Sequence, residues 1–376
     1  MSDVAPPMGM LAELSHRCPQ RCVYCSNPLE LTRKSEELAT DDWKRVLEQA
    51  AALGVIHVHL SGGEPTVRRD LEELVTHCVE LGLYTNLITS GVLLDAERLR
   101  GLADRGLDHI QLSFQGAEQG LADDIAGLDG AQAKKVQCAK WAREAGLRLT
   151  INAVVHRQNL HELEDILAMA KELGADRLEV AHAQYQGWAM RNIDASLPTR
   201  GQLEEATALV RKHRQRWEGE MEIDYVVPDF YAKYPKACMG GWGRQFLVVD
   251  PRGDVLPCHG AGQIDGMAFD NIRDRDLSNI WAESEAFERF RGTGWMPEPC
   301  RSCERKERDW GGCRCQAFAL IGDAAATDPV CVKSAQNDLV QAKVQAVNEE
   351  GMGDDRRGSW VYRSFQGVSY PGWDGT

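Results

Sequence analysis

The chain has 376 residues, of which 43% are hydrophobic and 27% are charged, and its 57 acidic and 43 basic residues give a formal net charge of −14. This composition is ordinary for a globular protein, and the length suggests two domains or one large domain with an extension. The acidic balance argues against a general nucleic-acid binder and against a partner for anionic membranes.

The N-terminal stretch MSDVAPPMGM has no basic region followed by an apolar core, so no secretory signal is expected. No run of about 18 apolar residues is present, so we expect no transmembrane helix. These features predict a cytoplasmic protein. In a reducing cytosol the 12 cysteines are expected to bind metal or take part in catalysis rather than to form disulfides.

Short apolar runs with β character alternate with helical patterns through the first half of the chain. Several of the helical patterns begin at acidic residues and end at glycine, as helix termini do. In one of them Leu71, Leu74, Val75 and Cys78 recur three and four residues apart. The expected strands are 11–15, 55–61, 85–90, 109–114, 148–155 and 177–183, and the helical patterns between them include 41–54, 70–82, 95–106, 133–146 and 159–174.

Repeated strand–helix units predict an α/β fold with a parallel sheet and right-handed crossovers. Six units suit a partial (βα)6 TIM-like barrel, and a doubly wound sheet remains the alternative. A further helix is expected at 201–217. Beyond about residue 220 the chain is rich in Gly, Pro and Cys, with short strands expected at 222–227 and 245–250. We therefore expect a barrel in residues 1–220, a Cys-rich domain in 221–340 and a tail in 341–376.

The end of the chain mixes glycines with aromatic residues from Gly351 onward. Two interpretations are open. The segment is either a flexible tail or an extended segment that packs its aromatic side chains on the body of the protein.

Polar residues interrupt the apolar strands at their C-terminal ends, where parallel barrels carry their working residues. This agreement favours an enzyme with its site at that rim. His57, His59 and His182 lie at alternating strand positions and are expected to pack or to form ordinary hydrogen bonds. The strand-end residues are the loop 18–25, then Gly62, Gly63, Glu64 and Pro65, then Thr89 and Ser90, Ser113 and Gln115, Asn152 and His156, and His182 and Gln184.

The stretch RCPQRCVYC places Cys18, Cys22 and Cys25 in one loop. A disulfide uses two sulfurs and a structural zinc site uses four ligands, so three thiols indicate a metal site that is completed from outside the chain. The C-x3-C-x2-C array, with Gly-Gly-Glu-Pro after the second expected strand, resembles the radical S-adenosylmethionine (radical SAM) superfamily closely. The resemblance implies three thiolates on a 4Fe–4S cluster whose fourth iron binds S-adenosyl-L-methionine (SAM).

The same resemblance implies further SAM contacts. Tyr24 matches the aromatic residue that usually precedes the third cysteine. Glu64 is expected to accept from the SAM ammonium, and Gly62 and Gly63 to let backbone approach the ligand. The implied contacts to ribose and carboxylate are Ser90, Ser113, Gln115 and Asn152.

A second set of cysteines lies beyond residue 220. GDVLPC (253–258) and the C-x2-C pair at 300–303 resemble the SPASM extension, which carries two auxiliary iron–sulfur clusters in peptide-modifying radical SAM enzymes. Where that pattern expects its next cysteine this chain has Asp309, and Cys315 is an additional thiol. Seven cysteines and Asp309 make the eight ligands that two clusters need. The resemblance suggests Cys238, Cys258, Cys313 and Cys315 for the first cluster, and Cys300, Cys303, Asp309 and Cys331 for the second.

A carboxylate ligand donates less charge than a thiolate, so Asp309 is expected to shift the potential of its cluster or to leave one iron more exchangeable. The crowded pair Cys313 and Cys315 would favour a smaller 2Fe–2S cluster at the first site. The alternative for this half is one or two zinc sites. Cys78 and Cys138, inside helical patterns, are expected to be buried structural thiols.

Longer stretches narrow the resemblance. PPMGMLAELSHRCPQRCVYCSNPLEL, HVHLSGGEP (57–65), LSFQG (112–116) and Asp309 all resemble the radical SAM family of pyrroloquinoline quinone (PQQ) biosynthesis, over roughly residues 8 to 335. The resemblance implies an oxidoreductase that forms a carbon–carbon crosslink between a Glu and a Tyr side chain of a ribosomal precursor peptide. A radical derived from SAM would remove a hydrogen from the glutamate, and an auxiliary cluster would accept the electron that the adduct loses.

The partners that this resemblance implies are a PqqA-like precursor peptide, a small PqqD-like peptide chaperone and a reductant protein such as flavodoxin. Two alternatives stay open. One is another SPASM enzyme, a thioether maturase or a sulfatase-maturing enzyme. The other is a non-catalytic scaffold that holds zinc.

Overall fold

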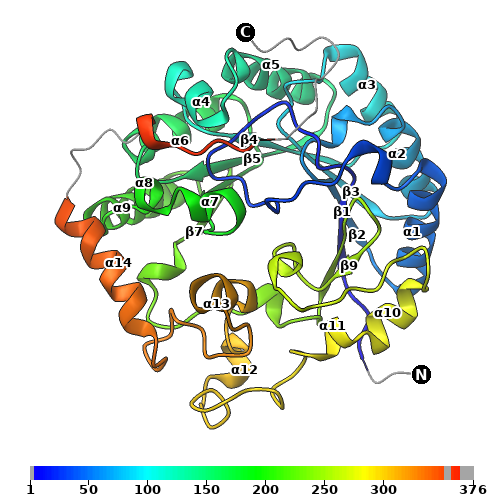
Figure 1. The fold of residues 1–376 in the computed structure, drawn as a ribbon. Coiled ribbons are helices and arrows are strands. Elements are labelled where there is room, and N and C mark those ends of the chain that lie inside the picture. The colour runs from blue at the N-terminus through cyan, green and yellow to red at the C-terminus, as the bar shows by residue number, and fades with distance from the viewer. Residues whose placement is uncertain (1–3, 351–356, 365–376) are drawn as a thin grey trace.

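A computed structural model describes residues 4–350 and 357–364 of the chain (Figure 1). Within these residues one sheet has the strand order β7-β6-β5-β4-β3-β2-β1-β8-β9. All neighbouring strands pair in parallel except β8 and β9. The strands are β1 (Gly9–Glu13), β2 (His57–Ser61), β3 (Tyr84–Thr89), β4 (His109–Phe114), β5 (Arg148–Val155), β6 (Arg177–His182), β7 (Glu222–Val226), β8 (Phe246–Val249) and β9 (Val255–Leu256).

The crossover helices lie in an arc around the outside of the curved sheet (Figure 1). Because the strand order runs from β7 to β9 without closing on itself, the barrel is open. The predicted partial (βα)6 barrel is thus confirmed. The helices between strands are α1 (Thr40–Leu53), α2 (Leu71–Glu80), α3 (Ala96–Asp104), α4 (Gln119–Ala126), α5 (Ala131–Glu144), α6 (Leu163–Glu172), α7 (Gly187–Arg191), α8 (Ile193–Ser196) and α9 (Arg200–Arg216).

The two faces of the sheet differ in polarity. In β4 every second residue is buried, and Ile110, Leu112 and Phe114 join the apolar core between sheet and helices. The residues between them point to the inner face, where Ser113 of β4 lies beside Asn152 of β5 in the strand register. The period of two along each strand therefore places the apolar core outside the sheet and polar side chains inside it.

Up to residue 250 the expected elements match the observed ones to within a few residues, with two differences. The first strand is 9–13 instead of 11–15. Beyond it, Leu14 N still donates to Ser61 O at 2.9 Å, and the chain then turns away from the sheet into the cysteine loop. The short helices α4, α7 and α8 had no counterpart in the sequence analysis. Neither did the strand at 255–256 or the five helices beyond residue 276, the last of which, at 337–350, runs ten residues into the expected tail. Cys78 and Cys138 are buried in the core, as expected.

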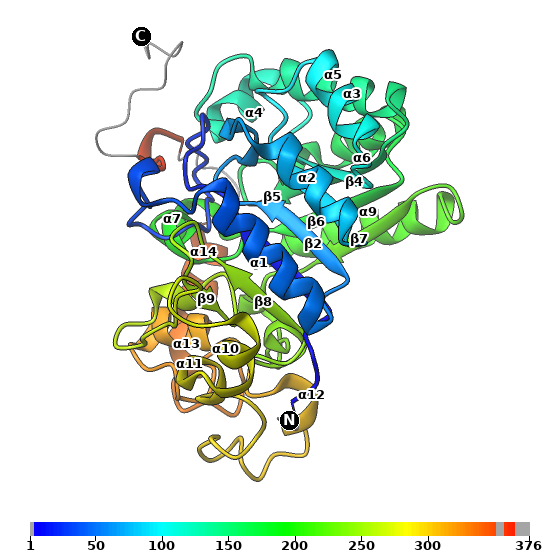
Figure 2. The same cartoon turned by 90° about the vertical axis from the view of Figure 1, so that its right-hand side faces the viewer.

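The C-terminal part lies beside β8 and β9 (Figure 2). The strand β7 begins just after the change in composition near residue 220, yet it pairs with β6 in the barrel sheet. On the other side of the sheet, β8 pairs with β1. The helices of this part are α10 (Leu277–Glu283), α11 (Glu285–Glu288), α12 (Lys306–Asp309), α13 (Arg314–Ile321) and α14 (Asn337–Glu350).

After α14, the described residues resume at 357 with a single 3₁₀ turn, η7 (Arg357–Ser359), and an extended stretch to Ser364. Trp360 is buried there, so this stretch packs on the body of the protein. The other residues of the aromatic-rich end, 351–356 and 365–376, lie outside the described residues. No helix in the described part of the chain is both long and apolar enough to span a bilayer.

Candidate active site at the barrel rim

A cavity of about 400 Å³ opens at the carboxyl ends of the barrel strands. Its wall contains the cysteine loop and the ends of six strands, β2 to β7, which the parallel topology brings to one rim. Among its lining residues are ten that the sequence analysis assigned to the cluster or to SAM: Cys18, Cys22, Tyr24, Cys25, Gly62, Gly63, Ser90, Ser113, Gln115 and Asn152.

The Gly-Gly turn after β2 holds the chain that enters the cysteine loop. Gly63 N donates to Ser15 O at 2.5 Å. A Cβ on Gly62 would collide with the same oxygen, and a Cβ on Gly63 would lie 2.5 Å from His16 O. The close approach that these glycines permit is therefore to the backbone of residues 15–17. Their predicted approach to a ligand stays a prediction.

Glu64 joins the ends of β2 and β3 below the cavity wall. Its side chain is fully buried, and Oε1 accepts from Thr66 N at 3.1 Å, Thr66 Oγ1 at 2.6 Å and Thr89 Oγ1 at 2.6 Å. The other oxygen, Oε2, accepts from Ser90 N at 2.8 Å and Ser90 Oγ at 2.5 Å. Both oxygens are thus engaged in positioning Thr89 and Ser90. The predicted contact of Glu64 with the SAM ammonium stays a prediction.

The loop thiols are half-buried and lie near both positive and negative side chains. Burial raises the pKa of Cys18 well above its usual value and that of Cys22 to about 11, and it also raises the pKa of Cys25. The positive charge of Arg363 opposes this shift at all three thiols, and that of Lys135 opposes it at Cys22. Bound iron would favour the thiolate forms, as the two cations do. The environment fits an iron–sulfur cluster.

Lys135 is a site residue that the sequence analysis missed. It is fully buried in α5, and burial lowers its pKa to about 8. Its ammonium donates to Gln115 Oε1, and Gln115 Nε2 donates to the Tyr24 hydroxyl at 2.5 Å. A signal was present: Lys135 precedes Cys138 by three residues, so the helical period places the lysine on the face that buries that thiol.

Several polar atoms at the cavity have no hydrogen-bond partner among the described residues. Asn152 Nδ2 donates to Glu179 Oε2 at 3.0 Å, while Asn152 Oδ1 is buried and unpartnered. Gln20 Nε2 and Asn27 Nδ2 are also buried and have no partner among the described residues. All three residues line the cavity. Buried polar groups are normally satisfied, so these atoms fit a polar ligand such as SAM.

The strand histidines make local contacts, as expected. His59 Nδ1 lies 3.1 Å from Asn86 Nδ2, and His182 Nε2 lies 3.1 Å from the Tyr225 hydroxyl. Burial lowers the pKa of His59 to about 4 and that of His182 to about 3, so both rings are neutral at pH 7. His57 packs its ring against Tyr84 with 5.0 Å between centroids.

A first group of four thiols lies in the C-terminal part. The side chains of Cys238 and Cys315 each interact with those of Cys258 and Cys313, which lowers the pKa of Cys258 and Cys313 and raises that of Cys238 and Cys315. Among the described residues no three or more His, Cys, Asp or Glu side chains form a ready-made site for one metal ion. The four sulfurs instead contact one another as a ring.

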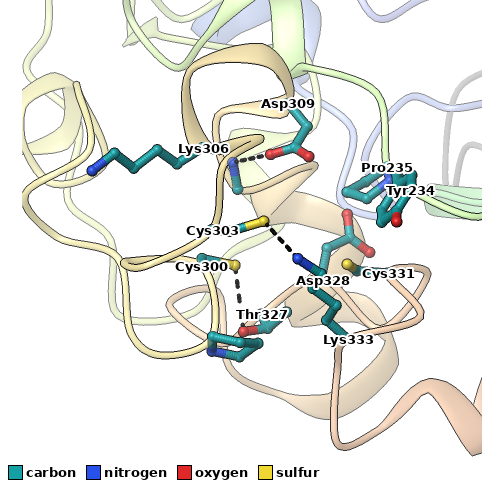
Figure 3. Close-up of a pocket in the computed structure, with 12 residues that line it drawn as sticks. Tyr234, Pro235, Cys300, Cys303, Lys306, Asp309, Thr327, Asp328, Cys331 and Lys333 are labelled. Atoms are coloured by element: carbon teal, nitrogen blue, oxygen red, sulfur yellow. Dashed lines mark hydrogen bonds between the residues drawn. The ribbon is translucent and has the colours of Figure 1, made fainter.

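A second group surrounds one small pocket (Figure 3), where the sulfurs of Cys300, Cys303 and Cys331 and the carboxylate of Asp309 face a common space. Cys300 Sγ lies 3.5 Å from Thr327 Oγ1, and Lys333 Nζ donates to Cys303 Sγ at 3.2 Å. The eight predicted ligands therefore fall into two spatial groups of four. The donor set of each group fits an iron–sulfur cluster.

Asp328, missed by the sequence analysis, lies between the two groups. Its fully buried carboxylate lines the pocket of the second group and accepts from Cys313 N of the first at 2.8 Å. It also accepts from Val330 N at 3.0 Å and Gln316 Nε2 at 3.0 Å. Burial raises the pKa of Asp328 to about 6. The carboxylate thereby fixes the position of one loop relative to the other.

A second link joins the barrel rim to the first thiol group. His259, which follows Cys258, lies 3.2 Å from the hydroxyl of Ser26, which follows Cys25. Its other ring nitrogen contacts the buried carboxylate of Glu13 at the end of β1. Although burial acts in the opposite direction, the charge of Glu13 raises the pKa of His259 to about 9. A charged hydrogen-bonded pair therefore connects two cysteine-bearing loops.

Two family models match this chain. Residues 12–170 match the radical SAM superfamily, and residues 238–304 match the SPASM iron–sulfur cluster-binding domain. The fold also agrees with that of solved structures. Streptococcus suis SuiB bound to the precursor peptide SuiA has a TM-score of 0.71 at 21% identity, over 87% of this chain and 76% of that one. The enzyme anSMEcpe with bound AdoMet and a peptide has a TM-score of 0.63 at 17% identity, over 92% of this chain and 98% of that one.

The fold and both matches define a radical SAM enzyme with a SPASM domain, whose cofactors are SAM, the 4Fe–4S cluster that binds it and auxiliary iron–sulfur clusters. Curated relatives give the family. Proteins named PqqA peptide cyclase from Bradyrhizobium diazoefficiens and Rhodopseudomonas palustris are each 56% identical, over 96% and 97% of this chain and 94% and 96% of their own. The chain belongs to the PqqA peptide cyclase family, which confirms the resemblance to enzymes of PQQ biosynthesis.

Proposed function

We propose that this enzyme forms a carbon–carbon bond between a glutamate and a tyrosine side chain of a PqqA-like precursor peptide. The observation that carries the proposal is the full-length similarity to PqqA peptide cyclases, 53% identity or more in each of three relatives over at least 96% of this chain. The three-cysteine loop at the rim cavity supports it.

In this proposal Cys18, Cys22 and Cys25 bind the SAM-site cluster. With the cluster and SAM bound there, the site would supply radical chemistry that removes a hydrogen atom from the substrate. Residues of the protein orient the ligand. Glu64 holds Ser90 in place, and the hydrogen bonds from Lys135 to Gln115 and from Gln115 to Tyr24 hold one wall of the cavity in place. The residues that we assign to SAM are Tyr24, Gly62, Gly63, Glu64, Ser90, Ser113, Gln115 and Asn152.

The two C-terminal groups would hold the auxiliary clusters, with Cys238, Cys258, Cys313 and Cys315 on the first and Cys300, Cys303, Asp309 and Cys331 on the second. Their role in the reaction follows from electron balance. Joining a saturated carbon to an aromatic ring removes two hydrogen atoms. One leaves with the SAM-derived radical, and the other leaves as a proton and an electron that requires an acceptor.

The substrate and partners complete the proposal. A peptide long enough to carry both reacting residues must enter the open barrel, where the strand ends exclude water from the reacting side chains. A PqqD-like chaperone would deliver that peptide, and a flavodoxin-like protein would supply the electron. We place the reaction in the cytoplasm, where the thiols stay reduced before cluster assembly.

The test is anaerobic. The reconstituted enzyme is mixed with dithionite, SAM, the precursor peptide and its chaperone, and the peptide mass is recorded. We expect a loss of two hydrogens, 5′-deoxyadenosine as coproduct, and fragmentation that joins the Glu and Tyr residues. A peptide with Gln in place of that Glu serves as the control and should keep its mass. Formation of 5′-deoxyadenosine with an unchanged peptide would contradict the substrate assignment, and a bond at sulfur would indicate a thioether maturase.

A further inference from the structure

Residues 357–364, here called the C-terminal strap, lie along the cysteine loop although more than 300 residues separate the two in sequence. In Figure 1 the strap (red) runs beside the loop that follows β1 (blue). Trp360 packs in a small apolar cluster with Val23 of the loop and with Leu121 and Ile125 of α4. Burial of such a ring anchors the strap at one point.

A single amide ties the strap to the loop. Asn192 Oδ1 accepts from Val361 N at 2.8 Å, and Asn192 Nδ2 donates to Val361 O at 2.8 Å. The same Nδ2 donates to Val23 O at 2.7 Å. Asn192 therefore pairs with both the N–H and the carbonyl of Val361 in the strap, and its amide also binds the carbonyl of Val23 in the cysteine loop.

The next residues fix the end of the strap. The guanidinium of Arg21 lies 5.6 Å from the centroid of the Tyr362 ring. Arg363 N donates to Arg21 O at 3.2 Å. The strap therefore contacts the loop at Arg21 through two successive residues, Tyr362 and Arg363, and these contacts fix the position of Arg363.

Arg363 reaches the cavity itself. The residue is only 3% exposed, it lines the cavity, and its Nη2 donates to His16 O. Cys18, Cys22 and Cys25 line the same cavity, so the guanidinium and the three thiols face one space. A guanidinium is charged at every physiological pH, and burial away from water makes its field strong at short range.

We propose that the C-terminal strap is part of the SAM-cluster site, and that Arg363 is a positioning residue whose fixed charge raises the reduction potential of that cluster. The inference rests on the proposed function, because it takes Cys18, Cys22 and Cys25 as the cluster ligands. Adding an electron makes a thiolate-bound cluster more negative. A buried cation beside the ligands stabilises the reduced form more than the oxidised form.

The experiment compares four variants of the reconstituted enzyme with the full chain. Arg363→Gln removes the charge, and Arg363→Lys keeps it. A chain that ends at Ser359 lacks the packed part of the strap, and a chain that ends at Ser364 keeps all of it. Each is titrated with reductant under anaerobic conditions and followed by electron paramagnetic resonance. The SAM-site cluster is recognised as the signal that changes when SAM is added.

We expect Arg363→Gln and the chain ending at Ser359 to shift the midpoint potential of that signal to more negative values. Arg363→Lys and the chain ending at Ser364 should stay close to the full chain, and the auxiliary signals should not move. An unchanged midpoint in Arg363→Gln would overturn the proposal. If Arg363→Gln loses the signal altogether, recovery in Arg363→Lys supports the role of charge, and loss in both variants overturns it. A full chain with no SAM-responsive signal would instead contradict the proposed function.

Discussion

At the scale of single residues, Asp309 distinguishes this chain most clearly from the usual SPASM pattern. Its carboxylate is 9% exposed and faces the same pocket as three cysteines. Oδ1 accepts from Gly311 N at 3.3 Å, and Oδ2 lies 3.3 Å from Arg305 Nε. The side chain is therefore held at the pocket with a preset orientation, as a ligand must be.

Replacing Asp309 by Cys should keep the second auxiliary cluster but alter its redox behaviour. A thiolate donates more charge to iron than a carboxylate does, so we expect a more negative potential and a changed paramagnetic resonance spectrum. Asp274→Cys, which adds the same thiol at an exposed position, serves as the control. An unchanged spectrum and potential in Asp309→Cys would argue that Asp309 is not a ligand.

Which residues could be predicted from the sequence depends on how far apart their partners lie. The loop thiols and Tyr24 occupy one short stretch whose spacing is typical of the superfamily, so the sequence alone could single them out as candidates. Arg363 and His259 reach the same rim from distant parts of the chain, and no local pattern connects either residue to Cys18–Cys25. Glu64 was found, but its hydrogen bonds to Ser90 and Thr89 depend on how β2 and β3 lie side by side.

At the scale of elements, the turn after β2 and the segment after β1 form one unit. Gly62 has a φ of 129°, and its missing side chain makes room for Ser15 O. Glu64 N then donates to Arg17 O at 2.8 Å, directly before the first cysteine. The Gly-Gly-Glu turn thereby sets the path of the chain into the cysteine loop.

Replacing Gly62 by Ala should displace the cysteine loop. The new Cβ would collide with the backbone oxygen of Ser15, and the positive φ adds strain of about 1–3 kcal/mol. The matched control is Gly82→Ala, at a φ of 71° with nothing within 4 Å of the added Cβ. It places a side chain at a positive φ without a collision. We expect Gly62→Ala alone to lose iron equivalent to one 4Fe–4S cluster. Equal iron content in the two variants would show that the turn does not shape the site.

The elements were easier to predict than their contacts. The strands 109–114 and 148–155 were predicted with the observed ends, because alternating apolar residues mark a sheet with one buried face. The helices α7 and α8 were missed because each is too short for a helical period to repeat. α7 ends directly before Asn192 and α8 begins directly after it. The contact of Asn192 with the strap could therefore not be predicted from the sequence.

At the scale of the whole molecule, one sheet connects the two parts of the enzyme. β1 pairs with β2 of the barrel on one side and with β8 on the other. The cysteine loop leaves the end of β1, and Cys258 follows β9, which pairs with β8. The Glu13–His259–Ser26 contacts then bridge the two cysteine-bearing loops. The arrangement places the proposed SAM-site cluster and the first auxiliary cluster on a shared frame.

The central claim is that the loop at the barrel rim holds the cluster that cleaves SAM, and the most direct measurement is 5′-deoxyadenosine formation by Cys22→Ala. The variant loses one of three iron ligands, so under dithionite and without oxygen it should form none while the C-terminal thiol groups retain their iron. Cys78→Ala, which removes a buried thiol of α2, should cleave SAM at the rate of the unaltered enzyme. Cleavage by Cys22→Ala at that same rate would contradict the account.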